Sequence, residues 1–374
     1  MKWRKKINGT LVVCIVLTLI ASPLCASASN IRAVELQSDR FTQIVNIEIE
    51  KVKLINDQVD SNIKVCSKKQ ATDFAGNEYT IIECDPTGYM IYNVENGLFC
   101  EIALWEYSPY MGYDADLYYC GPTYYYRKVN NEYIHLLDGE ERLTAKETNQ
   151  LIVASNNLQQ NYKKYQNEDI LRYIRTGNVT AYNNHKTYVE QEAAVPRISS
   201  SVNTWFRNLK NCGYISGGKC GFIALNILYA YYDKFYNDSW VDNKHWTNSS
   251  KTGLKSTLSE ELYSLSPKSS TTAMHIEKVS KLYAEKKGIS VKHETWLAPI
   301  ANIQSVRNKI DQGYPVAVFG SLSGPTGSPE YGNHAVVAFD TVFSDSWECH
   351  LGYNNRSTVY CTGVVGSYYI LKQP

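Results

Sequence analysis

A cysteine stands directly ahead of a long apolar stretch, in a place where a thiol becomes reactive. Cys220 follows Gly217-Gly218-Lys219 and opens a run that stays largely apolar to Tyr236. Glycines let the backbone turn sharply, and the unpaired N–H groups and dipole of a helix's first turn lower the pKa of a thiol. Lys219 adds a positive charge. This pattern alone fits a nucleophile and a small buried cysteine, or half a disulfide with Cys212, equally well.

A thiolate nucleophile needs a base that poises it and protonates the leaving group. His334 is the candidate, because it stands where a loop rich in Gly, Pro and Ser, residues 321–332, enters an apolar strand. His350 follows sixteen residues later. If the two strands form a hairpin, we expect His350 to return beside His334 and orient its imidazole, as the third member of a triad does. Asp340 and Asn354 stay open as alternatives for that role.

These blocks together resemble papain-like cysteine peptidases. The stretches that carry the resemblance are Cys220–Asn226, Gly332–Val337 and His350–Tyr353. Within that clan they look closest to the bacterial streptopain-like and bacteriocin-leader-peptidase-like enzymes, over residues 200–374. Residues 80–126 are more loosely similar to a streptopain-type propeptide.

The resemblance implies a role for each matched residue. Cys220 matches the nucleophile, and His334 matches the general base and acid. His350 matches the orienting position, which the family usually fills with Asn or Asp. The implied reaction is hydrolysis of peptide bonds in protein or peptide substrates through an acyl-enzyme, with no metal and no cofactor.

The oxyanion site departs from the family pattern. Papain-like enzymes usually place a glutamine six residues before the cysteine, and that position is Tyr214 here. We therefore expect Asn211 or Ser216 to replace it as a donor. The backbone N–H of Cys220 should contribute as well, because backbone donors serve this purpose in acyl transfer.

The elements that must position these residues predict an α+β fold for residues 197–374. Cys220–Tyr236 is apolar on nearly every face, which is typical of a buried central helix. Further helices are expected at Ala273–Lys287 and Ile303–Gln312, each followed by a glycine. The expected strands of an antiparallel sheet are Pro315–Phe319, Ala335–Val342, Trp347–Gly352 and Gly366–Leu371. Helices followed by strands favour a helical subdomain packed on a sheet.

The first half predicts a different, mainly antiparallel β domain over residues 29–196. Short β-type runs and turn signals fill residues 31–142, including a loosely alternating run at Gln43–Val52. Nine tyrosines crowd Tyr107–Tyr133, which fits either aromatic strands on a half-buried sheet or a stacking surface for sugars or peptides. An amphipathic helix is expected at residues 144–166 behind a capping box. The polar stretch at 176–200 is expected to be a linker and a place for cleavage.

The N-terminus predicts export. A basic start is followed by an apolar run, Leu11–Ile20, and by the small-x-small site Ala26-Ser27-Ala28, which is the layout of a signal peptide at residues 1–28. Cleavage would release a secreted, extracellular protein, in keeping with a bacterium, and no later segment is apolar enough to span a bilayer. Residues 29–196 would then be a prodomain that inhibits the peptidase until it is removed, or, in the alternative, a permanent binding domain whose Tyr-rich sheet holds glycans.

Composition limits the other function classes. The chain has 38 Lys and Arg against 37 Asp and Glu, so its net charge of +1 gives no argument for nucleic acid or an anionic membrane surface as partner. One rival is a catalytically inactive papain-like adhesin or binding protein with a Tyr-rich recognition domain. A second rival is a metal protein with Cys220, His334, Cys349 and His350 as ligands. Neighbouring residues on a strand point to opposite faces, which disfavours the metal site.

Overall fold

The structure is a computed structural model. It describes residues 38–56, 58–137, 142–162, 167–193, 200–268, 271–297, 301–321, 334–341, 346–356, 358–361 and 364–373. The expected signal peptide, residues 1–28, lies outside these ranges, as do Gly332 and Asn333 of the histidine block.

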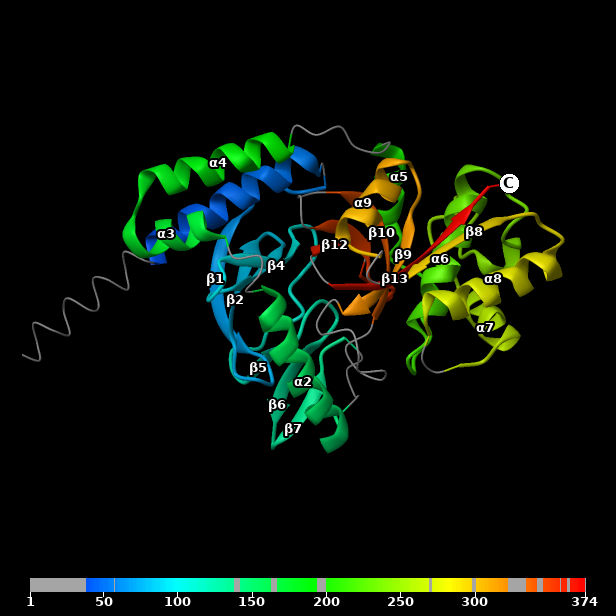
Figure 1. The fold of residues 1–374 in the computed structure, drawn as a ribbon, viewed down its shortest axis with the longest axis horizontal. Coiled ribbons are helices and arrows are strands. Elements are labelled where there is room, and N and C mark those ends of the chain that lie inside the picture. Colours follow the sequence, from blue (N-terminus) through cyan, green and yellow to red (C-terminus); the bar gives the residue numbers. More distant parts are fainter. Residues whose placement is uncertain are drawn as a thin grey trace, which may run out of the picture.

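A single large sheet, 13-stranded within the described residues, runs through the molecule (Figure 1). Its order is β7-β6-β5-β1-β2-β3-β4-β12-β11-β10-β9-β13-β8, and its pairings are antiparallel except that of β1 with β5. The strands are β1 (Lys64–Thr72), β2 (Glu78–Asp85), β3 (Tyr89–Asn93), β4 (Leu98–Ala103), β5 (Leu117–Tyr119), β6 (Tyr125–Val129), β7 (Glu132–His135), β8 (Lys292–Leu297), β9 (Val316–Ser321), β10 (His334–Thr341), β11 (Trp347–His350), β12 (Thr358–Cys361) and β13 (Val364–Lys372). The expected mixture of helices with a mostly antiparallel sheet is confirmed.

Helices flank both parts of this sheet (Figure 1). They are a helix over residues 38–55, α2 (Ala145–Tyr162), α3 (Glu168–Thr176), α4 (Val179–Ala193), α5 (Ser200–Asn208), α6 (Cys220–Phe235), η2 (Asn243–His245), α7 (Ser256–Leu265), α8 (Ala273–Lys287) and α9 (Ile303–Asp311). The helix over residues 38–55 and α4 lie side by side on the N-terminal part, while α6, α7 and α8 gather beside the C-terminal part.

The predicted central helix is buried, as its apolar surface requires. Residues Gly221 to Asp233 of α6 are all buried, and the helix packs against β9, β10, α7 and α8. Along β10, Ala335, Val337 and Phe339 join the core beneath α6. The alternate residues Val336 and Ala338 join a second core with α9 on the other face. The C-terminal sheet therefore lies between two helical layers, which fixes α6 against the start of β10.

The sheet continues across the expected boundary near residue 196. β4 of the N-terminal half pairs with β12 of the C-terminal half, through Ile102 opposite Tyr360 and Glu101 opposite Cys361. Beside this seam, the Trp105 ring packs edge-on against Tyr360. The two halves thus share main-chain hydrogen bonds as well as side-chain contacts.

Two sequence expectations in the first half are wrong. The run Gln43–Val52 is helical, because Ile44, Val45, Ile49 and Val52 recur at helical spacing and are all buried on one face. The expected linker at 176–200 contains α4 and the start of α5, and only its residues 194–199 lie outside the described part. A polar composition marked this stretch as a linker, but tertiary contacts of α4 with α3 support a helix there.

Other expectations agree closely with the structure. The helix expected at 144–166 begins at Ala145 and is described to Tyr162, and its Thr144–Glu147 capping box is present. The tyrosine-rich segment is partly buried, with Tyr110, Tyr119 and Tyr125 in the interior and Tyr107 exposed. Within the described residues, none of the helices combines the length and apolar character needed to cross a bilayer.

Candidate active site

Cys220 is the first residue of α6, at the end of a glycine turn. Gly217 and Gly218 have φ values of +81° and +70°, a conformation that glycine adopts without strain. Lys219 is the N-cap residue, and its side chain makes no capping hydrogen bond. Within this first turn, the backbone N–H of Gly221 hydrogen-bonds the Cys220 sulfur.

Gly221 is required by close packing next to the thiol. A Cβ atom at this position would lie 2.1 Å from the Thr271 Oγ1 atom and 3.1 Å from Ile276. The loop that precedes α8 therefore touches the first turn of α6, and any side chain at residue 221 would push it away. This explains why a glycine follows the cysteine.

His334 begins β10 and faces the thiol. Its imidazole hydrogen-bonds the Cys220 side chain, and the side chain of His334 is buried, with 7% of its surface exposed. The Nε2 atom lies 2.7 Å from the carbonyl oxygen of Leu351. Because a carbonyl only accepts, Nε2 carries the proton, which leaves Nδ1 to receive the proton of the thiol.

The surroundings of Cys220 favour its thiolate. Burial by itself raises the pKa of this thiol. The hydrogen bond and charge of His334, together with the N–H groups of Ala335 and Gly221, outweigh burial and hold the pKa below its ordinary value. Cys212, which has backbone hydrogen bonds but no histidine partner, behaves in the opposite way, since burial raises the pKa of its thiol to about 12. The pKa values of Cys220 and Cys212 thus differ because only Cys220 has a histidine partner.

A column of aromatic rings covers the imidazole. The Tyr353 ring stacks on His334 with centroids 5.9 Å apart, and Tyr214 stacks on Tyr353 at 5.1 Å. Tyr214 stands at the position that papain-like enzymes usually fill with a glutamine, and its ring packs against that of Tyr353. From the N-terminal half, His135 of β7 approaches the same Tyr353 at 6.4 Å.

The three candidates for the orienting residue all lie against other groups. The His350 ring bonds the carbonyl oxygen of Leu209 and the N–H of Gly352, so it does not orient His334 directly. Asp340 accepts from Asn203 far along β10, and the Asn354 side chain accepts from the N–H of Cys212. The carbonyl of Leu351 takes the expected position on Nε2 instead.

The two proposed oxyanion donors stay outside the pair. Asn211 and Ser216 are exposed, and the backbone carbonyl of Asn211 accepts from the N–H of Leu254. Sequence reasoning missed the groups that the structure brings to the site, namely the Leu351 carbonyl and the Ala335 N–H. These are backbone groups, so residue type carries no signal for them.

The alternative metal set does not converge. Both ring nitrogens of His350 have protein partners, and the sulfur of Cys349 lies 3.4 Å from that of Cys361, turned toward the neighbouring strand. Among the residues that the structure describes, no three His, Cys, Asp or Glu side chains are grouped to hold a metal ion.

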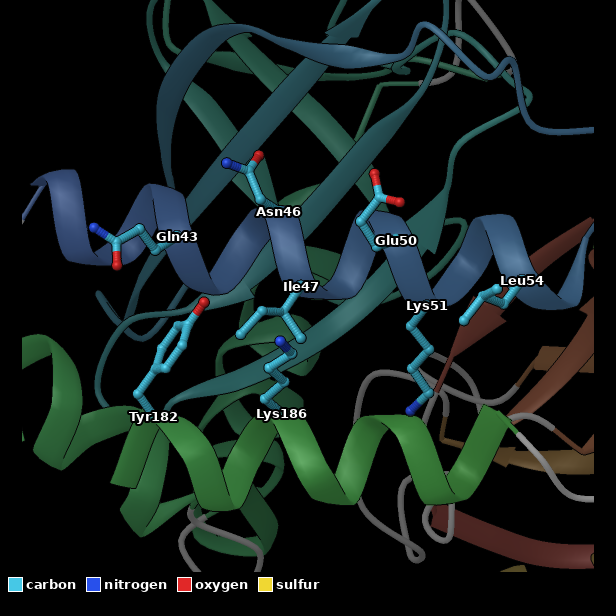
Figure 2. A pocket seen from close by; sticks show the side chains of 8 residues that line it. All are labelled: Gln43, Asn46, Ile47, Glu50, Lys51, Leu54, Tyr182 and Lys186. Carbon is cyan, nitrogen blue, oxygen red and sulfur yellow. The ribbon is translucent and has the colours of Figure 1, made fainter. Parts of the chain in front are cut away.

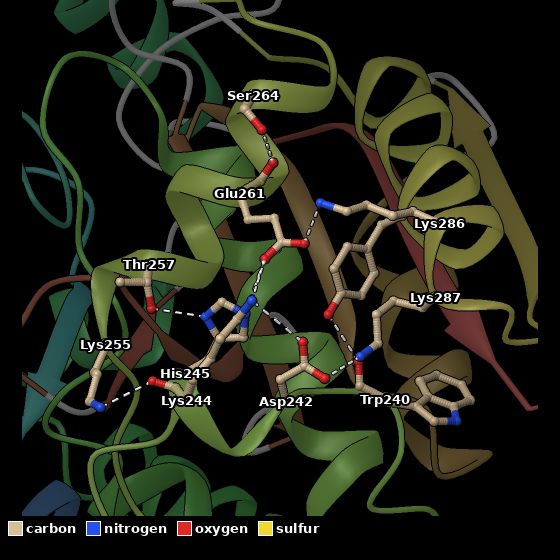
Figure 3. A network of polar contacts seen from close by, with 11 residues as sticks. Trp240, Asp242, Lys244, His245, Lys255, Thr257, Glu261, Ser264, Lys286 and Lys287 are labelled. Carbon is tan, nitrogen blue, oxygen red and sulfur yellow. Dashed lines mark hydrogen bonds and ion pairs between the residues drawn. The ribbon is translucent and has the colours of Figure 1, made fainter.

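Two other features lie apart from this site. A groove of about 330 Å³ runs between the helix at 38–55 and α4, lined by Ile47, Leu54 and Tyr182 among others (Figure 2). In the C-terminal half, the buried His245 joins the Thr257 hydroxyl, at 2.8 Å, to the Glu261 carboxylate, at 3.1 Å (Figure 3). The polar network of His245 ties η2 to α7 and contains none of the site residues.

No family model matches the chain, and no curated protein is significantly similar to it.

Proposed function

We propose that the protein is a secreted cysteine peptidase with a papain-like catalytic domain. The observation that carries the proposal is the Cys220 thiol at the start of α6, hydrogen-bonded to an imidazole whose other nitrogen is fixed by a carbonyl. A thiol beside a positioned base at a helix N-terminus is the arrangement that activates a cysteine nucleophile.

The mechanism is acyl transfer. The Cys220 thiolate attacks the carbonyl carbon of a peptide bond, and N–H donors at the start of α6 stabilise the tetrahedral oxyanion. The His334 imidazolium gives its proton to the departing amine, which leaves a thioester on Cys220. His334 then takes a proton from water as the water oxygen attacks the thioester carbonyl, and the C–S bond breaks to release the carboxylic acid product. This restores the Cys220 thiolate beside the His334 imidazolium.

Alkylation as a function of pH tests the nucleophile. Iodoacetamide at pH 6 should modify Cys220 at least about tenfold faster than the exposed Cys66, because the thiolate is the reactive form. Cys212 should stay unmodified in the native protein, since its thiol is buried and has a raised pKa. Mass spectrometry of the separated peptides gives the three rates.

A matched pair of variants links reactivity to hydrolysis. Cys220→Ala should abolish cleavage of an unfolded protein substrate, while Cys212→Ala should keep it. If Cys220 is alkylated no faster than Cys66, the catalytic proposal is wrong, and an inactive papain-like binding protein becomes the better interpretation.

The N-terminal half acts in this proposal as an intramolecular inhibitor. Its support is the approach of His135 to Tyr353, the ring that stacks on His334. Leu136 and Leu137, which follow β7, pack on the same core cluster as Tyr353. Limited proteolysis near residues 194–199 should therefore raise peptidase activity, with the mass of the active species identifying what was removed.

The shared sheet favours a second candidate for this half. Removing β4 would leave β12 with an open edge, because Ile102 and Glu101 pair with it. In the alternative, the tyrosine-rich half stays attached as a permanent binding domain. Full activity of the uncut chain, unchanged by proteolysis, would decide for that alternative.

A further inference from the structure

His350 is fully buried and makes two directional hydrogen bonds. Its Nε2 atom lies 2.8 Å from the carbonyl oxygen of Leu209, the residue after α5, and the N–H of Gly352 lies 3.0 Å from its Nδ1 atom. A carbonyl only accepts and an amide N–H only donates, so both contacts require the neutral ring with its proton on Nε2. Burial lowers the pKa of His350 to about 4, with Glu106 and Lys210 acting in opposite directions.

The Gly352 N–H and the Leu351 carbonyl belong to one peptide group. The group is planar, and in its trans form the N–H and the carbonyl point in opposite directions. The N–H end is held by His350, and the carbonyl end accepts the Nε2 proton of His334 at 2.7 Å. One rigid plane therefore connects the two imidazoles.

The local backbone suits this bridging position. Gly352 has φ +80°, and a Cβ atom there would lie 3.4 Å from Ile223 of α6. Tyr353 follows immediately and stacks on His334. The turn thus packs on α6 on one side and on the His334 imidazole on another. Among the contacts of the described residues, only the one from His350 holds the Leu351–Gly352 peptide group by its N–H.

We propose that His350 is a positioning residue for the cysteine–histidine pair. It fixes the Leu351–Gly352 peptide group so that the Leu351 carbonyl holds His334 in the tautomer whose Nδ1 receives the thiol proton. The inference rests on the proposed function and deepens it, because it replaces the side-chain orienting group of a triad by a backbone carbonyl that a second histidine holds. Hydrogen bonds in such a chain polarise one another, which further favours the imidazolium.

Three variants separate positioning from general stability. His350→Leu removes both hydrogen bonds, whereas His350→Gln offers a carbonyl oxygen to Gly352 and an amide N–H to Leu209. The matched control is His245→Leu, which removes an equally buried histidine with two side-chain contacts in the same half (Figure 3). For each, the rate of Cys220 alkylation by iodoacetamide is measured from pH 4 to pH 9, beside a thermal melt.

We expect His350→Leu to raise the apparent pKa of the Cys220 thiol by about one unit, which slows alkylation on the acid side about tenfold. His350→Gln should stay within about threefold of the unmodified protein. His245→Leu should lower the melting temperature but leave the pH profile in place. A folded His350→Leu with an unchanged profile, or a His245→Leu with the same shift, would overturn the proposal.

A measurement on the unaltered protein applies even if His350→Leu does not fold. In protein labelled with ¹⁵N-histidine, His350 should show the neutral Nε2–H tautomer from pH 5 to pH 8, with a slowly exchanging Gly352 N–H. Titration of His350 in that range, or a proton on Nδ1, contradicts the inference. Failure of the proposed function is distinguishable, since Cys220 of the unaltered protein would then react like Cys66.

Discussion

Two ionisable groups, the buried Glu101 of β4 and the half-buried Cys220 at the start of α6, have pKa values shifted in opposite directions. In the N-terminal half, Glu101 of β4 is fully buried and accepts hydrogen bonds from Tyr89 at 2.5 Å, Tyr119 at 3.2 Å and Tyr125. Burial outweighs these bonds and raises the pKa of Glu101 to about 7. In the C-terminal half, partners outweigh burial and lower the pKa of Cys220.

The difference lies in the charge of the hydrogen-bonding partners. Tyrosine hydroxyls donate hydrogen bonds but bring no net charge, so a carboxylate among them still loses its hydration without full compensation. His334 becomes a cation as Cys220 becomes an anion, and the attraction between them grows as water is excluded. Burial therefore neutralises an acid among neutral donors and supports an ion pair beside a base.

The largest effect should come from removing the base. His334→Ala should lower peptide hydrolysis by at least on the order of 10⁴-fold, since the thiolate loses its counter-charge and the leaving amine loses its proton donor. Burial would then act on Cys220 as it acts on Cys212. The rates of peptide hydrolysis and of Cys220 alkylation by iodoacetamide are measured on the variant. Near-normal values of both would contradict the view that His334 stabilises the thiolate.

A buried pair in which both members are charged sharpens the comparison next. Arg207 of α5 bonds both carboxylate oxygens of Glu348 on β11, at 2.9 and 2.7 Å, and both side chains are almost fully buried. Arg207→Met should cost about 3–5 kcal/mol of unfolding free energy, because Glu348 is left as an unpaired buried charge.

The control for this pair is the double variant. Arg207→Met with Glu348→Leu should recover part of the lost stability, because the Glu348 charge is removed, while the buried Asp340 still loses its ion pair with Arg207, at 3.9 Å. Denaturant unfolding of the three proteins measures both terms. If Arg207→Met is as stable as the unaltered protein, Glu348 must be hydrated in the variant, and its charge is then not buried.

A smaller, pH-dependent effect is expected at Glu101. Its folded pKa of about 7 exceeds its ordinary value of 4.5, so the folded state binds the proton more tightly. Its contribution to stability is complete below pH 4.5 and is lost as the pH rises to 7, by about 3 kcal/mol. Glu101→Gln should remove this decrease while the tyrosines keep a polar partner.

Urea unfolding of both proteins at pH 5 and pH 8 checks the sign. The variant should gain relative to the unaltered protein at pH 8 and differ less at pH 5. An equal difference at both values would mean that Glu101 is charged throughout, as an ordinary carboxylate is.

The smallest effect should come from Lys219, despite its place next to the nucleophile. Its Nζ atom lies 4.3 Å from the centroid of the Tyr263 ring, so its charge is directed to α7. Lys219→Ala should change Cys220 alkylation at pH 6 by less than about twofold, because the charge lies over the Tyr263 ring and is screened by salt. A tenfold loss would show that a surface cation, and not only His334, stabilises the thiolate.

Sequence patterns located the helices that have strong local signals. Helix α8 runs from Ala273 to Lys287 as predicted, because Thr272 caps its start and Gly288 adopts the left-handed conformation at its end. Strand β12 and helix α7 were not predicted, since β12 is only four residues long and α7 carries a weak apolar pattern. The helix at 38–55 was mistaken for a strand because its β-branched residues favour strands when packing is unknown.

Long-range polar partners left no trace in the sequence. Arg207 and Glu348 are 141 residues apart along the chain, and neither stands in a motif. The tyrosines around Glu101 could be expected to be buried, but not to meet one carboxylate. Such pairs depend on how the sheet is ordered, which local patterns do not specify.

The sequence by itself determined that a cysteine begins a buried helix and that a histidine begins an apolar strand, because helix and strand starts are written in local residue types. Tertiary structure alone decided that the two side chains meet. It also decided that the second histidine, His350, holds a peptide group instead of touching the first. The physical reason is that every residue carries the same carbonyl and N–H, so only the folded path of the chain selects which of them act.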